Sequence, residues 1–120
     1  NDSFGHPVGD SVILGVVRCL KAAVPATAHI GRVGGEEFTV LLPQHDSDGA
    51  VCVAEQVRAA IEAHPFGLPD ASCITASFGV SWRPSGGRFD DAYSLADEAL
   101  YAAKRSGRNQ VVRAADHATA

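Results

Sequence analysis

The sequence predicts a domain of the α+β class, an α/β sandwich with helices covering a mixed, mostly antiparallel sheet. Three observations support this prediction. Helical periodicity recurs in three separate segments of the chain. A Gly-Gly pair divides two short apolar segments, which is typical of a hairpin. In residues 74–81, apolar residues alternate with residues that are polar or glycine, which is typical of a strand. The order helix, hairpin, helix, strand, helix, strand indicates a two-layer arrangement.

The first helix begins at Asp10 and ends before Pro25, which cannot continue it. Residues 28–33 are expected to form a strand. Gly34 and Gly35 are expected to form a tight turn, since adjacent glycines accept the positive φ angles that such turns need. Residues 36–42 form the expected return strand. The apolar positions that define the helix are Val12, Val16, Leu20 and Val24.

Periodicity predicts the remaining elements in the same way. Gly107 follows the last periodic helix and is expected to cap its carboxyl end. The tail over 115–120 is expected to be frayed or disordered. The expected elements are a helix over residues 50–61, a strand over 74–80, a loop over 82–88, a helix over 89–104 and a strand over 110–113.

Composition limits the functional classes. With 120 residues, 46% of them hydrophobic, the chain suits one globular domain. A net charge of -4 argues against a nucleic-acid binder. No apolar run suits a membrane span and no leader is present, so no membrane contact by this domain is expected. The chain begins at Asn1 without any Met, so we expect a piece of a longer protein. Cys19, Cys52 and Cys73 are widely spaced, which predicts buried free thiols.

The turn Gly34-Gly35-Glu36-Glu37-Phe38 is the most informative segment. Two carboxylates directly after a glycine pair suit Mg²⁺, which takes one or two carboxylates together with substrate phosphates. The glycines also allow a ligand to approach the backbone. The alternative interpretation is a solvated hairpin tip whose charges prevent edge-to-edge association. This segment alone does not decide between the two.

Four segments in order resemble the GGDEF family of diguanylate cyclases. Gly34–Phe38 resembles the signature turn in its variant with Glu at the third position. Asn1–Asp10 is similar to the family's N-D-x-x-G-H-x-x-G-D stretch, and Thr75–Ser81 to its T-x-S-x-G-V-[SA] strand. Ala96–Asn109 is similar to the A-D-x-A-L-Y-x-A-K-x-x-G-R-N helix end. The resemblance runs from residue 1 to about residue 112, so residues 1–114 are expected to be one GGDEF domain, incomplete at its amino end.

The resemblance implies a ferredoxin-like, nucleotide-cyclase-like sandwich. It implies an enzyme that condenses two GTP molecules into cyclic di-GMP in bacterial second-messenger signalling, with Mg²⁺ or Mn²⁺ as cofactor. Each domain would hold one GTP, so catalysis needs a homodimer of two domains face to face. An upstream sensory or regulatory domain and a cytoplasmic location are implied as well, although the parent protein could be membrane-anchored. The alternative is a catalytically degenerate domain that senses GTP or binds a partner protein.

Roles follow from the resemblance position by position. Asn1 and Asp10 match residues that hydrogen-bond guanine, and His6 matches a position sometimes found in the substrate site. A carboxylate suits guanine because it accepts hydrogen bonds from N1 and N2. The alternative for Asp10 is a helix N-cap, and for His6 an ordinary turn histidine.

Charged residues in two further segments match the reaction centre. Glu36 matches the metal ligand and catalytic carboxylate, and Glu37 the second acidic position near the metals. Gly34 and Gly35 belong to the substrate-binding turn. Lys104 and Arg108 match residues that hold the terminal phosphates, and their spacing of four suggests neighbouring positions at a helix end. The alternative for these cations is interaction with the negative end of the helix dipole.

The resemblance also shows two departures from the family. The family's first strand, which carries a metal-binding Asp and leads to a Phe-Lys phosphate turn, precedes the part matched here. Because that strand is central in the family's sheet, the 120 residues alone are expected to be inactive, and either to borrow a strand from a neighbour or to be structurally compromised.

A ferredoxin-like nucleic-acid binder remains a third interpretation, weakened by the acidic charge.

The second departure generates a prediction about feedback. Many family members carry R-x-x-D shortly before the signature turn as a product-binding inhibitory site, whereas this chain has Pro25 and Ala28 there. Neither residue offers the charged, bidentate contacts that hold such a product. Added cyclic di-GMP should therefore not inhibit turnover through this segment. Inhibition that disappears when residues 25–28 are changed would contradict this prediction.

Overall fold

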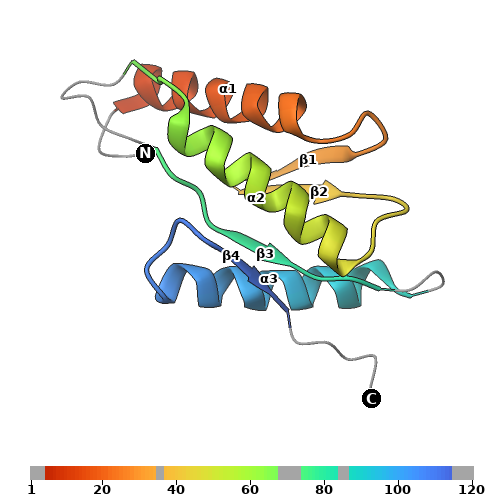
Figure 1. The fold of residues 1–120 in the computed structure, drawn as a ribbon. Coiled ribbons are helices and arrows are strands. Elements are labelled where there is room, and N and C mark those ends of the chain that lie inside the picture. The colour runs from red at the N-terminus through yellow and green to blue at the C-terminus, as the bar shows by residue number, and fades with distance from the viewer. Residues whose placement is uncertain (1–4, 35–36, 68–73, 84–86, 115–120) are drawn as a thin grey trace.

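The computed structural model describes residues 5–34, 37–67, 74–83 and 87–114 (Figure 1). Helices and strands follow one another in the predicted order, which confirms the α+β class. The expected tail and Cys73 lie outside the described residues. The elements are α1 (Gly5–Ala23), β1 (His29–Gly34), β2 (Glu37–Leu41), α2 (Ser47–Ala63), β3 (Phe78–Val80), α3 (Phe89–Arg105) and β4 (Val111–Arg113).

β1 and β2 form an antiparallel hairpin, as predicted. The register pairs His29 with Leu41 and Gly34 with Glu37, with an irregularity between Arg32 and Gly34. Gly34 is thus the last residue of β1 instead of a turn residue, and β2 begins at Glu37. Gly35 and Glu36 lie outside the described residues. The pairing nevertheless brings the signature segment to one end of a hairpin, as the glycine pair predicted.

β3 and β4 form a parallel pair. The Phe78 amide donates to the Gln110 carbonyl at 2.9 Å, and the Ala114 amide donates to the Val80 carbonyl at 2.7 Å, so one bond lies at each end of the pair. β3 is shorter than the predicted strand over residues 74–80 because β4 offers only three residues as partners. In the described part of the chain, the hairpin and the β3–β4 pair are two separate sheets.

The core lies where α1 and α2 meet, side by side in Figure 1. Cys19 and Leu20 of α1 pack against Val57 and Ile61 of α2, and all four residues are buried. Apolar residues of both strand pairs pack against this cluster, among them Phe38 and Val40 from the hairpin and Phe78 from β3, together with Ile74 from the segment before β3. One apolar cluster therefore holds two sheets that share no backbone bonds.

α3 lies on the opposite face of the β3–β4 pair. Phe78 packs toward α1 and α2, and adjacent strand residues point to opposite faces, so Gly79 faces α3. A Cβ at Gly79 would meet the Ala96 carbonyl oxygen and the Leu100 amide nitrogen. The helix backbone thus rests directly on the strand. Helices therefore cover both faces of this pair, whereas the sequence predicted only two layers. The alternation of residues along the strand did not reveal the second helical layer.

Two helices differ in their limits from the prediction. α1 begins at Gly5 instead of Asp10, so Asp10 lies inside the helix and is not its N-cap. α2 begins at Ser47, where Asp46 caps it by accepting a hydrogen bond of 2.7 Å from the Gly49 amide. Cys19 and Cys52 are free thiols as expected, but Cys52 is exposed because the helical repeat sets it on the side opposite Ile61.

Among the described residues, no helix combines the length and continuous apolar character that a bilayer crossing requires.

The contact at Gly79 generates a stability prediction. Gly79→Ala should lower the free energy of unfolding by about 3 kcal/mol, because the new methyl group meets helix backbone that cannot rotate away. Gly31→Ala is the matched control, since a Cβ at this β1 position meets nothing within 4 Å. Urea unfolding followed by circular dichroism measures both. Equal stabilities for the two variants would contradict the proposed contact.

Candidate functional site

The structure brings two of the predicted site segments together. Glu37 is the first residue of β2, at the signature end of the hairpin, and Lys104 lies in the last turn of α3. Glu37 Oε2 and Lys104 Nζ are 4.0 Å apart. No periodicity or spacing in the sequence indicates this proximity. An acidic hairpin end thus faces a cationic helix end, an arrangement that can bind a metal-associated phosphate group.

The pair between Glu37 and Lys104 is weak. Its side chains are 45% and 39% exposed, respectively, and 4.0 Å is the outer limit for an ion pair. A pair of this kind contributes at most about 1 kcal/mol. Both side chains are therefore available to a stronger partner. A phosphate would be one for Lys104, because charge-assisted contacts to phosphate oxygens are shorter and stronger.

The carboxyl end of α3 closes in a Schellman motif. The Ser106 amide donates to the Ala102 carbonyl, and the Arg108 amide donates to the Ala103 carbonyl, each at 2.9 Å. Gly107 has φ +119°, which confirms its predicted capping role. Arg108 thus lies beyond the helix, in the turn. This corrects the expectation that Lys104 and Arg108 are neighbours on the helix surface, since the helix ends at Arg105.

The turn continues in an unusual conformation. Arg108 and Asn109 also have positive φ, at 65° and 49°. This region costs roughly 1–2 kcal/mol for residues with a Cβ, although Asn tolerates it better than most. The segment holds this geometry only if other contacts compensate for the cost. Two neighbouring elements, α2 and the segment before β3, supply those contacts.

Asn109 is the centre of this set of contacts. Its amide donates to Ser77 Oγ at 3.1 Å. Its Oδ1 accepts from the Arg58 guanidinium at 3.0 Å, and its Nδ2 donates to Glu62 Oε2 at 3.1 Å. The sequence by itself predicts no role for Ser77, Arg58, Glu62 or Asn109. The Gly-Arg-Asn run was the available signal, because Asn and Gly favour positive φ.

Arg58 is held in turn by its own helix. Its guanidinium contacts Glu55 Oε1 at 2.6 Å and Glu62 Oε1 at 3.1 Å. The hydrogen bond to Glu55 raises the pKa of Arg58 above its ordinary value, with a further contribution from Glu62. The guanidinium therefore stays charged and fixed. Of its three side-chain partners, only Asn109 belongs to another element.

The structure places the remaining predicted residues less fully. Asp10 is exposed in α1, and no hydrogen bond or ion pair in the described chain links it to Glu37 or Lys104. His6 lies in the first turn of α1, but its side chain is outside the described part. Gly34 ends β1 beside Glu37. Asn1, Gly35 and Glu36 lie outside the described residues.

The donor set is compatible with Mg²⁺ but incomplete. Within the described ranges, no group of three or more His, Cys, Asp or Glu side chains gathers as a metal site. Glu37 alone provides a half-exposed carboxylate at the hairpin end. Mg²⁺ commonly uses one or two protein carboxylates and takes its remaining ligands from phosphates and water. Glu37 fits such a metal bound together with its substrate, and Glu36 lies outside the described residues.

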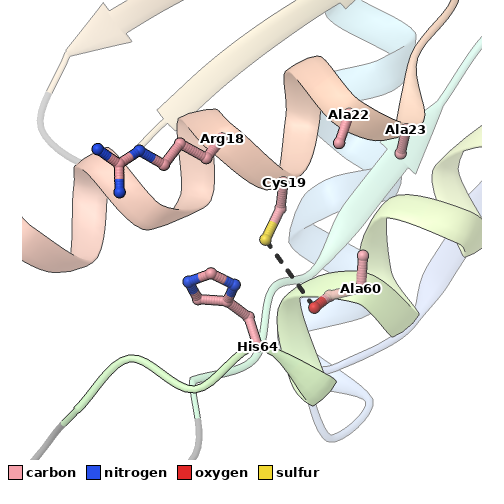
Figure 2. A pocket seen from close by; sticks show the side chains of 6 residues that line it. All are labelled: Arg18, Cys19, Ala22, Ala23, Ala60 and His64. Atoms are coloured by element: carbon pink, nitrogen blue, oxygen red, sulfur yellow. Dashed lines mark hydrogen bonds between the residues drawn. The ribbon is translucent and has the colours of Figure 1, made fainter.

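A second candidate is a hollow of about 430 Å³ between α1 and α2 (Figure 2). None of the predicted site residues lines it. The Cys19 thiol approaches the Ala60 carbonyl at 3.9 Å, and Arg18 and His64 also line the hollow. Three of its six lining residues are alanines, and burial raises the pKa of the Cys19 thiol. The hollow is an apolar depression without converging polar groups, so it is the weaker candidate.

The structure defines an α+β domain in which an acidic hairpin end meets a cationic helix end. The family model for the GGDEF domain of diguanylate cyclases matches residues 1–110. The chain therefore belongs to the GGDEF family, as the sequence motifs indicated. The nucleotide-cyclase-like fold is confirmed as well, because solved GGDEF domains superpose closely on the structure.

Individual relatives support this assignment. The chain is 40% identical to the probable diguanylate cyclase DgcT of Escherichia coli (strain K12), over 93% of this chain and 26% of that protein. The active GGEEF domain of a diguanylate cyclase from Vibrio cholerae has a TM-score of 0.85 at 36% identity, covering 97% of this chain and 74% of that one. The GGDEF domain of DgcB from Caulobacter crescentus, solved with c-di-GMP, has a TM-score of 0.87 at 31% identity, covering 97% and 68%. The chain thus spans about a quarter of its DgcT relative.

The two described thiols generate a reactivity prediction. Cys52 is exposed, whereas Cys19 is buried and has a raised pKa. Because the thiolate is the reactive form, iodoacetamide at pH 8 should label Cys52 at least about tenfold faster than Cys19. Mass spectrometry of the digested protein locates the label. Faster labelling of Cys19 would show that the contact between α1 and α2 opens readily in solution.

Proposed function

We propose that this domain binds GTP and, as a pair of domains, condenses two GTP molecules into cyclic di-GMP. The observation that supports the proposal is the proximity of Glu37 to Lys104, which joins the signature hairpin to the carboxyl end of α3. The solved DgcB domain, which contains c-di-GMP, supports it at the level of the family.

Each group has a chemical task in this proposal. Asp10, with Asn1, accepts hydrogen bonds from guanine N1 and N2 and selects the base. Because Asp10 lies inside α1, its carboxylate does not act as the N-cap of that helix. Lys104 and Arg108 hold the terminal phosphates, and Gly34 and Gly35 let the nucleotide approach the hairpin backbone. His6 lies near the start of the same helix as Asp10.

Glu36 and Glu37 would hold Mg²⁺, or Mn²⁺, against the triphosphate. The ion, when bound, neutralises charge that develops on the phosphates. The Glu36 carboxylate would accept the proton of the 3′-hydroxyl of one GTP as that oxygen attacks the α-phosphorus of the other. The new O3′–P bond forms as the bond to pyrophosphate breaks. A symmetric second attack completes the ring, so two domains must face one another.

We also propose that the 120 residues alone do not turn over GTP. In the described chain, the hairpin and the β3–β4 pair each contain two strands, and no Cα of one lies within 8 Å of the other. Two-stranded sheets are marginally stable by themselves. A strand from a preceding segment or from a neighbouring molecule would fix the hairpin and its carboxylates relative to α3.

The test measures cyclic di-GMP by chromatography and mass spectrometry after incubation with GTP and Mg²⁺. The chain extended by the sequence that precedes residue 1 in its parent protein should form product, and the 120 residues alone should not. Glu36→Gln and Glu37→Gln in the extended chain should each lower the rate at least about 100-fold. Glu98→Gln, which changes an exposed carboxylate elsewhere on α3, is the matched control.

The outcomes separate the functions. Product from the extended chain, lost in the two hairpin variants only, supports the cyclase. GTP binding without product would replace it with a GTP-sensing or protein-binding domain. Product from the 120 residues alone would contradict the proposed need for another strand.

A further inference from the structure

We infer that Arg58 is a positioning residue for nucleotide binding, which acts through Asn109 to aim Arg108 at the terminal phosphates. The inference rests on the proposed function, since it concerns the same site. Arg58 lies in α2, on an element that carries none of the predicted site residues. Arg58 would influence Arg108 through Asn109, the next residue in the chain, to which it donates a hydrogen bond.

The side chain of Arg108 needs an external support. It is exposed, and no side-chain hydrogen bond or ion pair in the described part of the chain restrains it. Its direction therefore depends on its backbone, which has φ 65° and lies between Gly107 and Asn109, both also at positive φ. Arg108 and Asn109 need support in this conformation, because the left-handed form is unfavourable for residues with a Cβ.

The structure supports both sides of Arg108. On the helix side, its own amide donates to the Ala103 carbonyl at 2.9 Å. On the other side, the Asn109 amide donates to Ser77 Oγ at 3.1 Å, and both ends of the Asn109 side-chain amide are used. The acceptor Oδ1 takes the Arg58 guanidinium, and the donor Nδ2 contacts Glu62. Arg58 and Glu62 also pair with one another at 3.1 Å, so the three side chains close a ring.

The chemistry of this ring identifies Arg58 as its essential member. Glu62 and Glu55 both contact its guanidinium, so its removal would leave two carboxylates without their cation and Asn109 Oδ1 without its donor. No other described cation contacts Asn109. A Met at this position keeps much of the apolar stem but none of the donors. Its loss should release Asn109, and with it the backbone angle that sets Arg108.

A purely structural brace between α2 and the turn would use the same contacts, so the test needs a readout that separates the two roles. Arg108 is proposed to contact terminal phosphates, which GTP has and GMP lacks. Mispositioning should therefore weaken GTP and leave GMP unchanged. General loosening of the fold should weaken both nucleotides alike.

The experiment measures dissociation constants for GTP and GMP, each with Mg²⁺, by calorimetry at a temperature where circular dichroism shows every variant folded. Arg58→Met should raise the GTP constant roughly tenfold, because a charge-assisted contact is lost, with the GMP constant unchanged. Asn109→Gly keeps the positive φ but removes the side-chain bonds, so it should act in the same direction. It also serves as the second variant if Arg58→Met fails to fold. Arg113→Met removes another inter-element ion pair, to Asp48 at 2.7 Å, and should change neither constant.

A double variant decides whether Arg58 acts through Arg108. Arg108→Ala combined with Arg58→Met should bind GTP no more weakly than Arg108→Ala alone, because the two changes remove one interaction. Additive losses, equal weakening of GTP and GMP, or no effect of Arg58→Met and Asn109→Gly would overturn the inference and leave the proposed function intact. Conversely, Arg58→Met could weaken the binding of GTP selectively in a protein that forms no cyclic di-GMP. That result would overturn the proposed cyclase activity and leave the inference about Arg58 intact.

Discussion

The close approach of α3 to β3 at Gly79 is the constraint on which the candidate site depends. The helix backbone rests on the strand at Gly79. A shift of α3 toward the sheet would cause steric overlap, and a shift away from it would lose packing. Ala99 and Ala103 of this same helix are also buried, so small side chains allow α3 to pack closely. The last turn of α3 consequently has a defined place relative to the hairpin. Lys104 can reach Glu37 only because of that placement.

The site joins elements that different forces hold in place. The hairpin is held by backbone bonds between β1 and β2 and by the apolar contacts of Phe38 and Val40 with the core. The turn after α3 is held by hydrogen bonds from α2 and from Ser77. Glu37 and Lys104 contribute little to stability where they meet. This division suits binding, since the charged groups can change partners without loss of the fold.

The sequence predicts the elements well because their signals are local. Apolar repeats placed α1, α2 and α3, and the glycine pair placed the hairpin. The limits of elements were harder, because they depend on partners. β3 has only three residues since β4 pairs with no more, although residues 74–80 alternate throughout. α1 starts before Asp10 in a segment without apolar periodicity.

The candidate site was predicted through motifs, and its geometry was not. Glu37 and Lys104 are distant in sequence, and no local rule brings them together. Arg108 was expected on a helix surface, whereas the Schellman motif moves it into the turn. The ring of Arg58, Glu62 and Asn109 gives no signal in periodicity, since it joins two elements through side chains. Cys52 was expected to be buried because free cysteines usually are, although its position opposite Ile61 sets it on the exposed face of α2.

In the proposed function, the hairpin end and the carboxyl end of α3 form one nucleotide site. An NMR titration of the isotopically labelled protein with GTP and Mg²⁺ tests this arrangement. The amide signals of Glu37, Lys104 and Arg108 should shift together along one binding curve. Shifts confined to residues that line the hollow between α1 and α2, such as Cys19, Ala60 and His64, would instead assign the nucleotide to that hollow.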